Sequence, residues 1–115
     1  MNATSPLNES LCVYLSNALN EVLNGFRVDF ENTLGSRQED VSQLFQKLSV
    51  LCDGKALHLE RISLVEAKLL LKCSNLCLQE LDADEFETRL GESPEVARQV
   101  NHAISSYVGT VSLSS

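Results

Sequence analysis

Cysteine and histidine are the residue types in this sequence that most often bind metals or act as nucleophiles. Cys73 and Cys77 lie four residues apart, which places two thiols on one face of a helix, and His58 or His102 could add ligands for zinc. Structural zinc sites usually combine two short-spaced ligand pairs, and the sequence holds no second pair. Ordinary core cysteines are the better interpretation, because a free thiol packs as a small hydrophobe. We therefore expect no metal site and no cofactor.

Catalysis by a nucleophile would require a cysteine or serine beside a histidine base. Neither His58 nor His102 has a recognisable nucleophile motif nearby, and the sequence contains no glycine-rich phosphate loop and no Gly-x-Ser-x-Gly elbow. We expect two surface histidines, no catalytic residues and no enzymatic activity.

Acidic residues are concentrated in one segment. Residues 82–95 hold six carboxylates and one arginine, and so carry five of the seven net negative charges of the 115-residue chain. The segment begins like a calcium loop, but Phe86 at the fifth position offers no oxygen and Glu87 replaces the glycine at the sixth. Two interpretations stay open: a solvated helix N-terminus, or a surface that steers a basic partner. The residues of the second interpretation are Asp82, Asp84, Glu85 and Glu87.

The elements that must position these residues are helices, because apolar residues recur every three or four positions. Helices are predicted over residues 6–34, 37–52, 63–81 and 83–90, with a last one from Pro94 to about residue 108. Capping boxes are predicted at Ser36/Glu39 and Ser63/Glu66. The predicted fold is all-α: a four- or five-helix antiparallel bundle with a long first helix. We expect a single domain over residues 1–115, frayed at 1–5 and 109–115.

The third predicted helix is apolar around most of its circumference. It is either the central helix of the bundle, or it keeps one flank open for a partner helix. The candidate flank is the stripe spaced by sevens, Leu64, Leu71 and Leu78.

Composition narrows the compartment and the partners. No apolar run approaches the roughly 20 residues of a membrane-spanning helix, and the net charge of −7 disfavours binding to phosphate backbones or anionic lipids. The first ten residues lack the features of a signal peptide. We therefore expect an intracellular protein whose four cysteines are free and buried.

One stretch resembles a known family. Ile62-Ser-Leu-Val-Glu-Ala-Lys68 and the leucine-rich residues after it resemble the neuroguidin-type family of nucleolar and nuclear-exosome cofactors, in which such a turn opens a leucine-rich helix. Gly91-Glu-Ser-Pro-Glu-Val96 is similar to the family's loop before its final helix. Ser63, Glu66 and Lys68 match the motif, and the similarity extends over residues 10–108 if the two preceding helices are included.

The resemblance implies a helical adaptor in rRNA processing or exosome-linked RNA decay, located in the nucleus or nucleolus. The sequence departs from the family in lacking a basic C-terminal extension, which speaks against direct RNA binding. We predict a non-catalytic interaction module with a helical, basic protein partner, and leave its oligomeric state open. The alternative is a helical scaffold subunit or small chaperone of another intracellular complex, which binds a partner helix in an apolar groove.

Overall fold

The chain is helical throughout the part that the structure describes. The computed structural model describes residues 9–25, 29–52 and 57–114, and these ranges contain no β-strand, so the all-α class is confirmed. The expected frayed end at residues 1–5 lies outside them. The α-helices are α1 (Glu9–Asn24), α2 (Gln38–Leu51), α3 (Leu64–Glu80), α4 (Ala83–Leu90) and α5 (Pro94–Ser114). The structure also contains a π-helical segment, η1 (Phe30–Leu34), and a three-residue 3-10 segment, η2 (Leu59–Arg61). With η2 left out, these ranges hold six helices rather than the predicted four or five.

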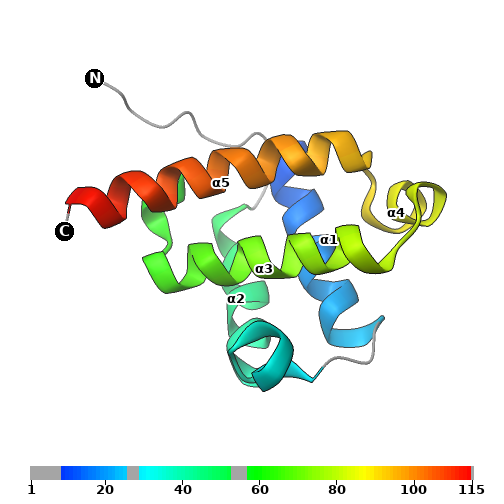
Figure 1. The fold of residues 1–115 in the computed structure, drawn as a ribbon, viewed down its shortest axis with the longest axis horizontal. Helices are drawn as coiled ribbons and strands as arrows, with labels where there is room; N and C mark the ends of the chain where they lie inside the picture. Colours follow the sequence, from blue (N-terminus) through cyan, green and yellow to red (C-terminus); the bar gives the residue numbers. More distant parts are fainter. Residues whose placement is uncertain (1–8, 26–28, 53–56, 115) are drawn as a thin grey trace.

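Helix α3 lies at the centre of the bundle (Figure 1). It packs against α1 and α5, while α2 packs against α1, and α4 contacts α1 and α5. The buried residues of α3 are Ala67, Leu69, Leu70, Cys73, Ser74, Leu76 and Cys77. Neighbours on more than one side explain why its sequence is apolar around most of the circumference.

Two aromatic side chains lie inside the core that joins the helices. Tyr14 of α1 and Phe86 of α4 are fully buried, and their ring centroids are 5.9 Å apart. The Tyr14 hydroxyl is hydrogen-bonded to the hydroxyl of Ser74, which is itself buried on α3. Burial raises the pKa of Tyr14 above its ordinary value of 10.0, so the phenol is neutral. This contact ties three helices together at one point.

Local capping explains where three of the helices begin. The Ser63 hydroxyl accepts from the Glu66 N–H at 3.1 Å, and the Glu66 carboxylate accepts from the Ser63 N–H at 2.8 Å, which confirms the capping box that starts α3. Asp82 accepts from the Glu85 N–H at 2.9 Å before α4, and the Ser93 hydroxyl accepts from the Val96 N–H at 3.3 Å before α5.

The capping box predicted at Ser36 and Glu39 is displaced by one residue. The N-cap of α2 is Arg37, and its backbone N–H donates to the Asp40 carboxylate at 2.9 Å. Adjacent acids at positions 39 and 40 offered two possible registers, and the observed one directs Asp40, rather than Glu39, to the helix start.

The long first helix predicted over residues 6–34 is not confirmed. Helix α1 ends at Asn24, residues 26–28 lie outside the described ranges, and Asp29 is extended and caps η1 through its side chain. Gly35 then closes η1 in the left-handed region, with φ of 66°. Gly25, a residue type that is unfavourable in a helix interior, directly follows the end of α1.

The last helix is longer than its apolar pattern predicts. Helix α5 continues through Gly109 to Ser114, where a frayed segment was expected over residues 109–115. The half-buried Tyr107 and Val108 pack against the core just before this extension. Once a helix is anchored, each further residue adds a hydrogen bond without a new nucleation step, so the continuation needs no periodic apolar face of its own.

The prediction of four free thiols is wrong for two of them. Cys12 of α1 and Cys52, which caps the end of α2, form a disulfide with a Cα–Cα distance of 6.0 Å. Cys73 and Cys77 are free and buried, as expected. The packing of α2 on α1 brings Cys12 and Cys52 together across 40 residues of sequence, a pairing that helical spacing does not reveal.

Candidate partner-binding cleft

The leucine stripe predicted as an open flank is half-buried along its length. Leu71 and Leu78 pack against the hydrophobic core, and Leu64 is half-buried in the first turn of α3. The large apolar side chain of α3 that is exposed in the described structure is Val65, which leaves 73% of its surface accessible. The exposed large apolar side chain of α3 is therefore one position away from the predicted stripe.

The acidic segment lies at the surface as helix α4 and its cap. Asp82 caps the helix, Asp84 is exposed in the first turn, and Glu85 pairs with Arg89 at 3.3 Å. Glu87 is also exposed. Acids in a first turn complement the partial positive charge of a helix N-terminus, so the structural interpretation of this segment is supported.

Arg89, the one base of this segment, turns inward toward α1. Its guanidinium lies 3.0 Å from the Glu21 carboxylate, and the Asn17 amide of α1 donates to the Leu90 carbonyl at 3.3 Å. These contacts hold the C-terminal end of α4 on α1. No cavity that the structure describes is lined by both a predicted acid and a leucine of the predicted stripe.

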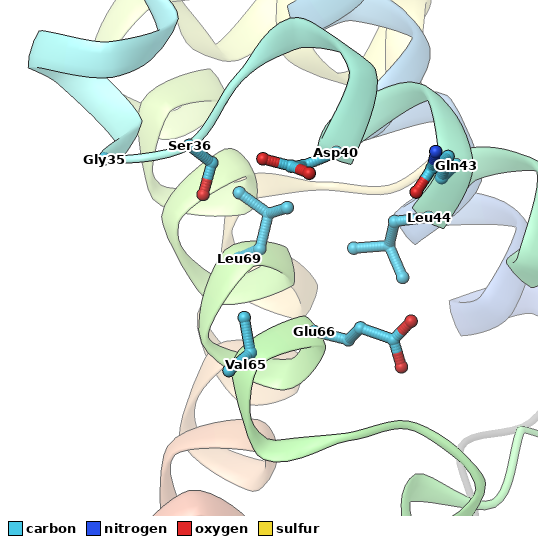
Figure 2. A pocket seen from close by; sticks show the side chains of 8 residues that line it. All are labelled: Gly35, Ser36, Asp40, Gln43, Leu44, Val65, Glu66 and Leu69. Carbon is cyan, nitrogen blue, oxygen red and sulfur yellow. The ribbon is translucent and has the colours of Figure 1, made fainter.

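A cleft of about 320 Å³ opens between α2 and α3 (Figure 2). Leu44 of α2 and Leu69 of α3 point toward one another across it, and the Asp40 and Glu66 carboxylates lie on either side of this apolar centre. Both leucines are almost fully buried, whereas Val65 stands exposed on the same wall as Leu69. The lining is completed by Gly35, Ser36 and Gln43.

The cleft exists because α2 and α3 each pack closely on α1 rather than on one another. An ion pair spans the gap between them: Lys47 Nζ of α2 lies 2.7 Å from Glu66 Oε1 of α3. The same oxygen accepts the capping bond from Ser63, and Asp40 Oδ2 accepts the bond from Arg37. Helix caps thus hold both carboxylates in place on the cleft walls.

Opposing influences set the charge of Glu66. Partial burial raises the pKa of its carboxyl. Hydrogen bonds from Lys47 and Ser63 and the positive charge of Lys47 lower the pKa by more than burial raises it, so the net pKa is below the ordinary value of 4.5. Glu66 is therefore ionised at neutral pH, and the cleft presents a fixed negative charge.

We expect this pair to make the stability of the protein depend on pH in acid. Because the folded-state pKa of Glu66 is lowered, its contribution to the free energy of unfolding is complete above its ordinary value of 4.5 and is lost as the pH falls through the lowered value. Glu66→Gln and Lys47→Gln should both flatten this part of the profile relative to the unmodified chain. Urea unfolding between about pH 3 and pH 7 measures it, and profiles parallel to that of the unmodified chain would contradict the assignment.

The groups considered for metal or nucleophilic chemistry lie elsewhere in the fold. Burial raises the pKa of the Cys73 thiol to about 12, and burial with nearby negative charge does the same for Cys77. His58 is exposed, with Nδ1 3.6 Å from a Glu60 carboxylate oxygen, and His102 is exposed on α5. Among the described residues, no three His, Cys, Asp or Glu side chains are grouped to hold a metal ion. Nor is any helix in these ranges long and apolar enough to cross a membrane.

Sequence reasoning missed the cleft, although parts of it were visible. Glu66 belongs to a predicted capping box, and Val65 and Leu69 are apolar residues within the third predicted helix, residues 63–81. Their spacing of four places Val65 and Leu69 on one helix face, which was a usable indication. The opposite wall, with Asp40 and Leu44, could not be assigned because it depends on how α2 lies on α1.

Comparisons of this chain with protein-family models, with curated proteins and with solved structures find no match.

Proposed function

We propose that the chain is a non-catalytic module that binds a protein partner at the α2–α3 cleft. The observation that carries this proposal is Val65, a large apolar side chain that is 73% exposed at the edge of a cleft whose centre is apolar. Protein-binding surfaces typically combine an apolar centre with a polar rim, and this cleft has both. The lining residues offer carboxylates, a hydroxyl, an amide and aliphatic carbon, and both carboxylates accept hydrogen bonds from helix-capping backbone N–H groups.

A pair of matched valines tests this proposal. Val50, on α2, is 77% exposed but does not line the cleft, so it is the natural control for Val65. A photoreactive benzoylphenylalanine at position 65 should crosslink a partner in cells, and the same residue at position 50 should not. Val65→Ser should weaken that interaction severalfold, since it removes the apolar contact without adding a charge. Equal crosslinking from both positions, or an unaffected Val65→Ser variant, would rule the cleft out.

The setting we propose for this module is an assembly that processes rRNA or degrades RNA with the exosome. The support is the resemblance of residues 62–68 to the neuroguidin-type motif, in which Ser63 and Glu66 form the cap of α3 and Lys68 is exposed. Mass spectrometry of the position-65 adducts decides the question. Components of exosome or nucleolar assemblies would support the proposal, and a partner from an unrelated complex would favour the helical scaffold subunit instead.

A further inference from the structure

The α2–α3 cleft combines an apolar centre with negative charge that its own residues do not fully neutralise. Its lining includes two carboxylates, Asp40 and Glu66, and no lysine or arginine. Lys47 reaches Glu66 from outside the lining and occupies Oε1, while the bonds that the structure describes for Asp40 engage Oδ2 alone. Within the part of the chain that the structure describes, Asp40 Oδ1 and Glu66 Oε2 therefore have no hydrogen-bond or ion-pair partner.

We propose that the occupant of this cleft is a basic amphipathic segment of the partner, which places an aliphatic side chain against Leu44, Val65 and Leu69 and a lysine or arginine against Asp40 and Glu66. This inference rests on the proposed function and names the chemistry of its partner. A helix laid in a groove presents such a pair when its apolar and basic residues are spaced by three or four.

The Lys47–Glu66 pair is an internal model for this contact. It places an ammonium group 2.7 Å from a carboxylate on the cleft wall, with the Glu66 side chain 27% exposed. A partly exposed carboxylate in that position binds a cation without the full desolvation penalty of a buried pair. At the other side of the apolar centre, beside Ser36, Asp40 offers a second carboxylate.

The net charge of the whole molecule also favours a basic occupant. The chain carries a net charge of −7, so a basic segment is attracted from a distance and an acidic one is repelled. Attraction over such distances is screened by salt, whereas the apolar contact at Val65 is not. The two contributions can therefore be separated by experiment.

The test uses the full chain and two synthetic helical peptides as probes. Both carry leucines spaced by three and four, one with arginines and the other with glutamates on the flanking positions. The arginine peptide should shift the amide resonances of Asp40, Leu44, Val65 and Leu69, and its Kd should rise severalfold when salt is increased. The glutamate peptide should not bind there. Equal binding of both peptides, or shifts confined to α4, would overturn the inference.

Charge-neutral variants locate the contact within the cleft. Asp40→Asn and Glu66→Gln keep an oxygen for the helix caps but remove the charge, and each should raise the Kd of the arginine peptide about two- to fivefold, the range of partly exposed ion pairs. Glu39→Gln is the matched control, because Glu39 neighbours Asp40 but lines a different hollow with Arg37, Gln38 and Ser42. Unchanged affinity in both cleft variants, or an equal loss in the control, would overturn the inference.

The inference and the proposed function can fail separately. If position 65 crosslinks a partner whose attached segment has no lysine or arginine within one helical turn, the cleft binds protein but the basic occupant is wrong. If the arginine peptide binds the cleft but position 65 never captures a partner in cells, the recognition chemistry stands and the proposed function does not. If neither peptide binds the cleft, the basic occupant is wrong, whatever position 65 captures.

Discussion

Phe86→Ala is expected to lower the free energy of unfolding by about 3–5 kcal/mol. The ring is completely buried, and it contacts Tyr14 of α1. Removing it forfeits the transfer free energy of the ring and leaves a cavity in a core that cannot fully collapse. Since domains of this size are stable by only about 5–15 kcal/mol, the variant loses a large share of its stability.

The effect is large because α4 has few other attachments. It is eight residues long, and its buried side chains are Phe86 and Leu90. A helix of this length is not stable alone and depends on what it packs against. Chemical unfolding followed by circular dichroism measures the loss, and Thr88→Ala, an exposed position on the same helix, is the control, with an expected change within about 0.5 kcal/mol. A loss below about 1 kcal/mol for Phe86→Ala would show that α4 is not anchored as described.

Reduction of the Cys12–Cys52 disulfide is expected to cost about 4 kcal/mol of stability, the loop-closure value for 40 residues of separation. The bond restricts the unfolded chain by joining α1 to the end of α2. The double variant Cys12→Ala/Cys52→Ala should be as unstable without reductant as the unmodified chain is with it, and reductant should not weaken it further.

Counting thiols in denaturant checks the same bond directly. The chain has four cysteines, so two thiols should react without prior reduction and four after it. Four reactive thiols in protein purified without reductant would contradict the disulfide. Cys73 and Cys77 should react in the folded protein far more slowly than in denaturant, because both are buried and their pKa values are raised to about 12.

Local patterns in the sequence predicted where α3, α4 and α5 begin because the groups that start a helix are close together in the chain. Ser63 with Glu66, Asp82 ahead of α4, and Ser93 before Pro94 each satisfy backbone donors within four residues. The pattern was ambiguous at Glu39 and Asp40, where two neighbouring acids were both able to cap, and it misplaced the helix start there by one residue.

The features that the sequence did not predict depend on how distant helices pack. The pairing of Cys12 with Cys52 requires α2 to lie on α1, and no periodicity in either helix states this. The cleft arises because α2 and α3 share α1 as a neighbour without closing on one another. For the same reason Val65 is exposed at the cleft, while Leu64, one position away, is half-buried.

The attachment of α4 to α1 also bears on the order in which the chain folds. Arg89 meets Glu21 across 68 positions of sequence, and Asn17 meets the Leu90 carbonyl across 73. Contacts of such high sequence separation gain their free energy only after a long loop has been closed, whereas α1 and α2 are near neighbours in the chain. We therefore expect the contacts that hold α4 on α1 to form after the packing of α2 on α1, because they require the closure of a much longer loop.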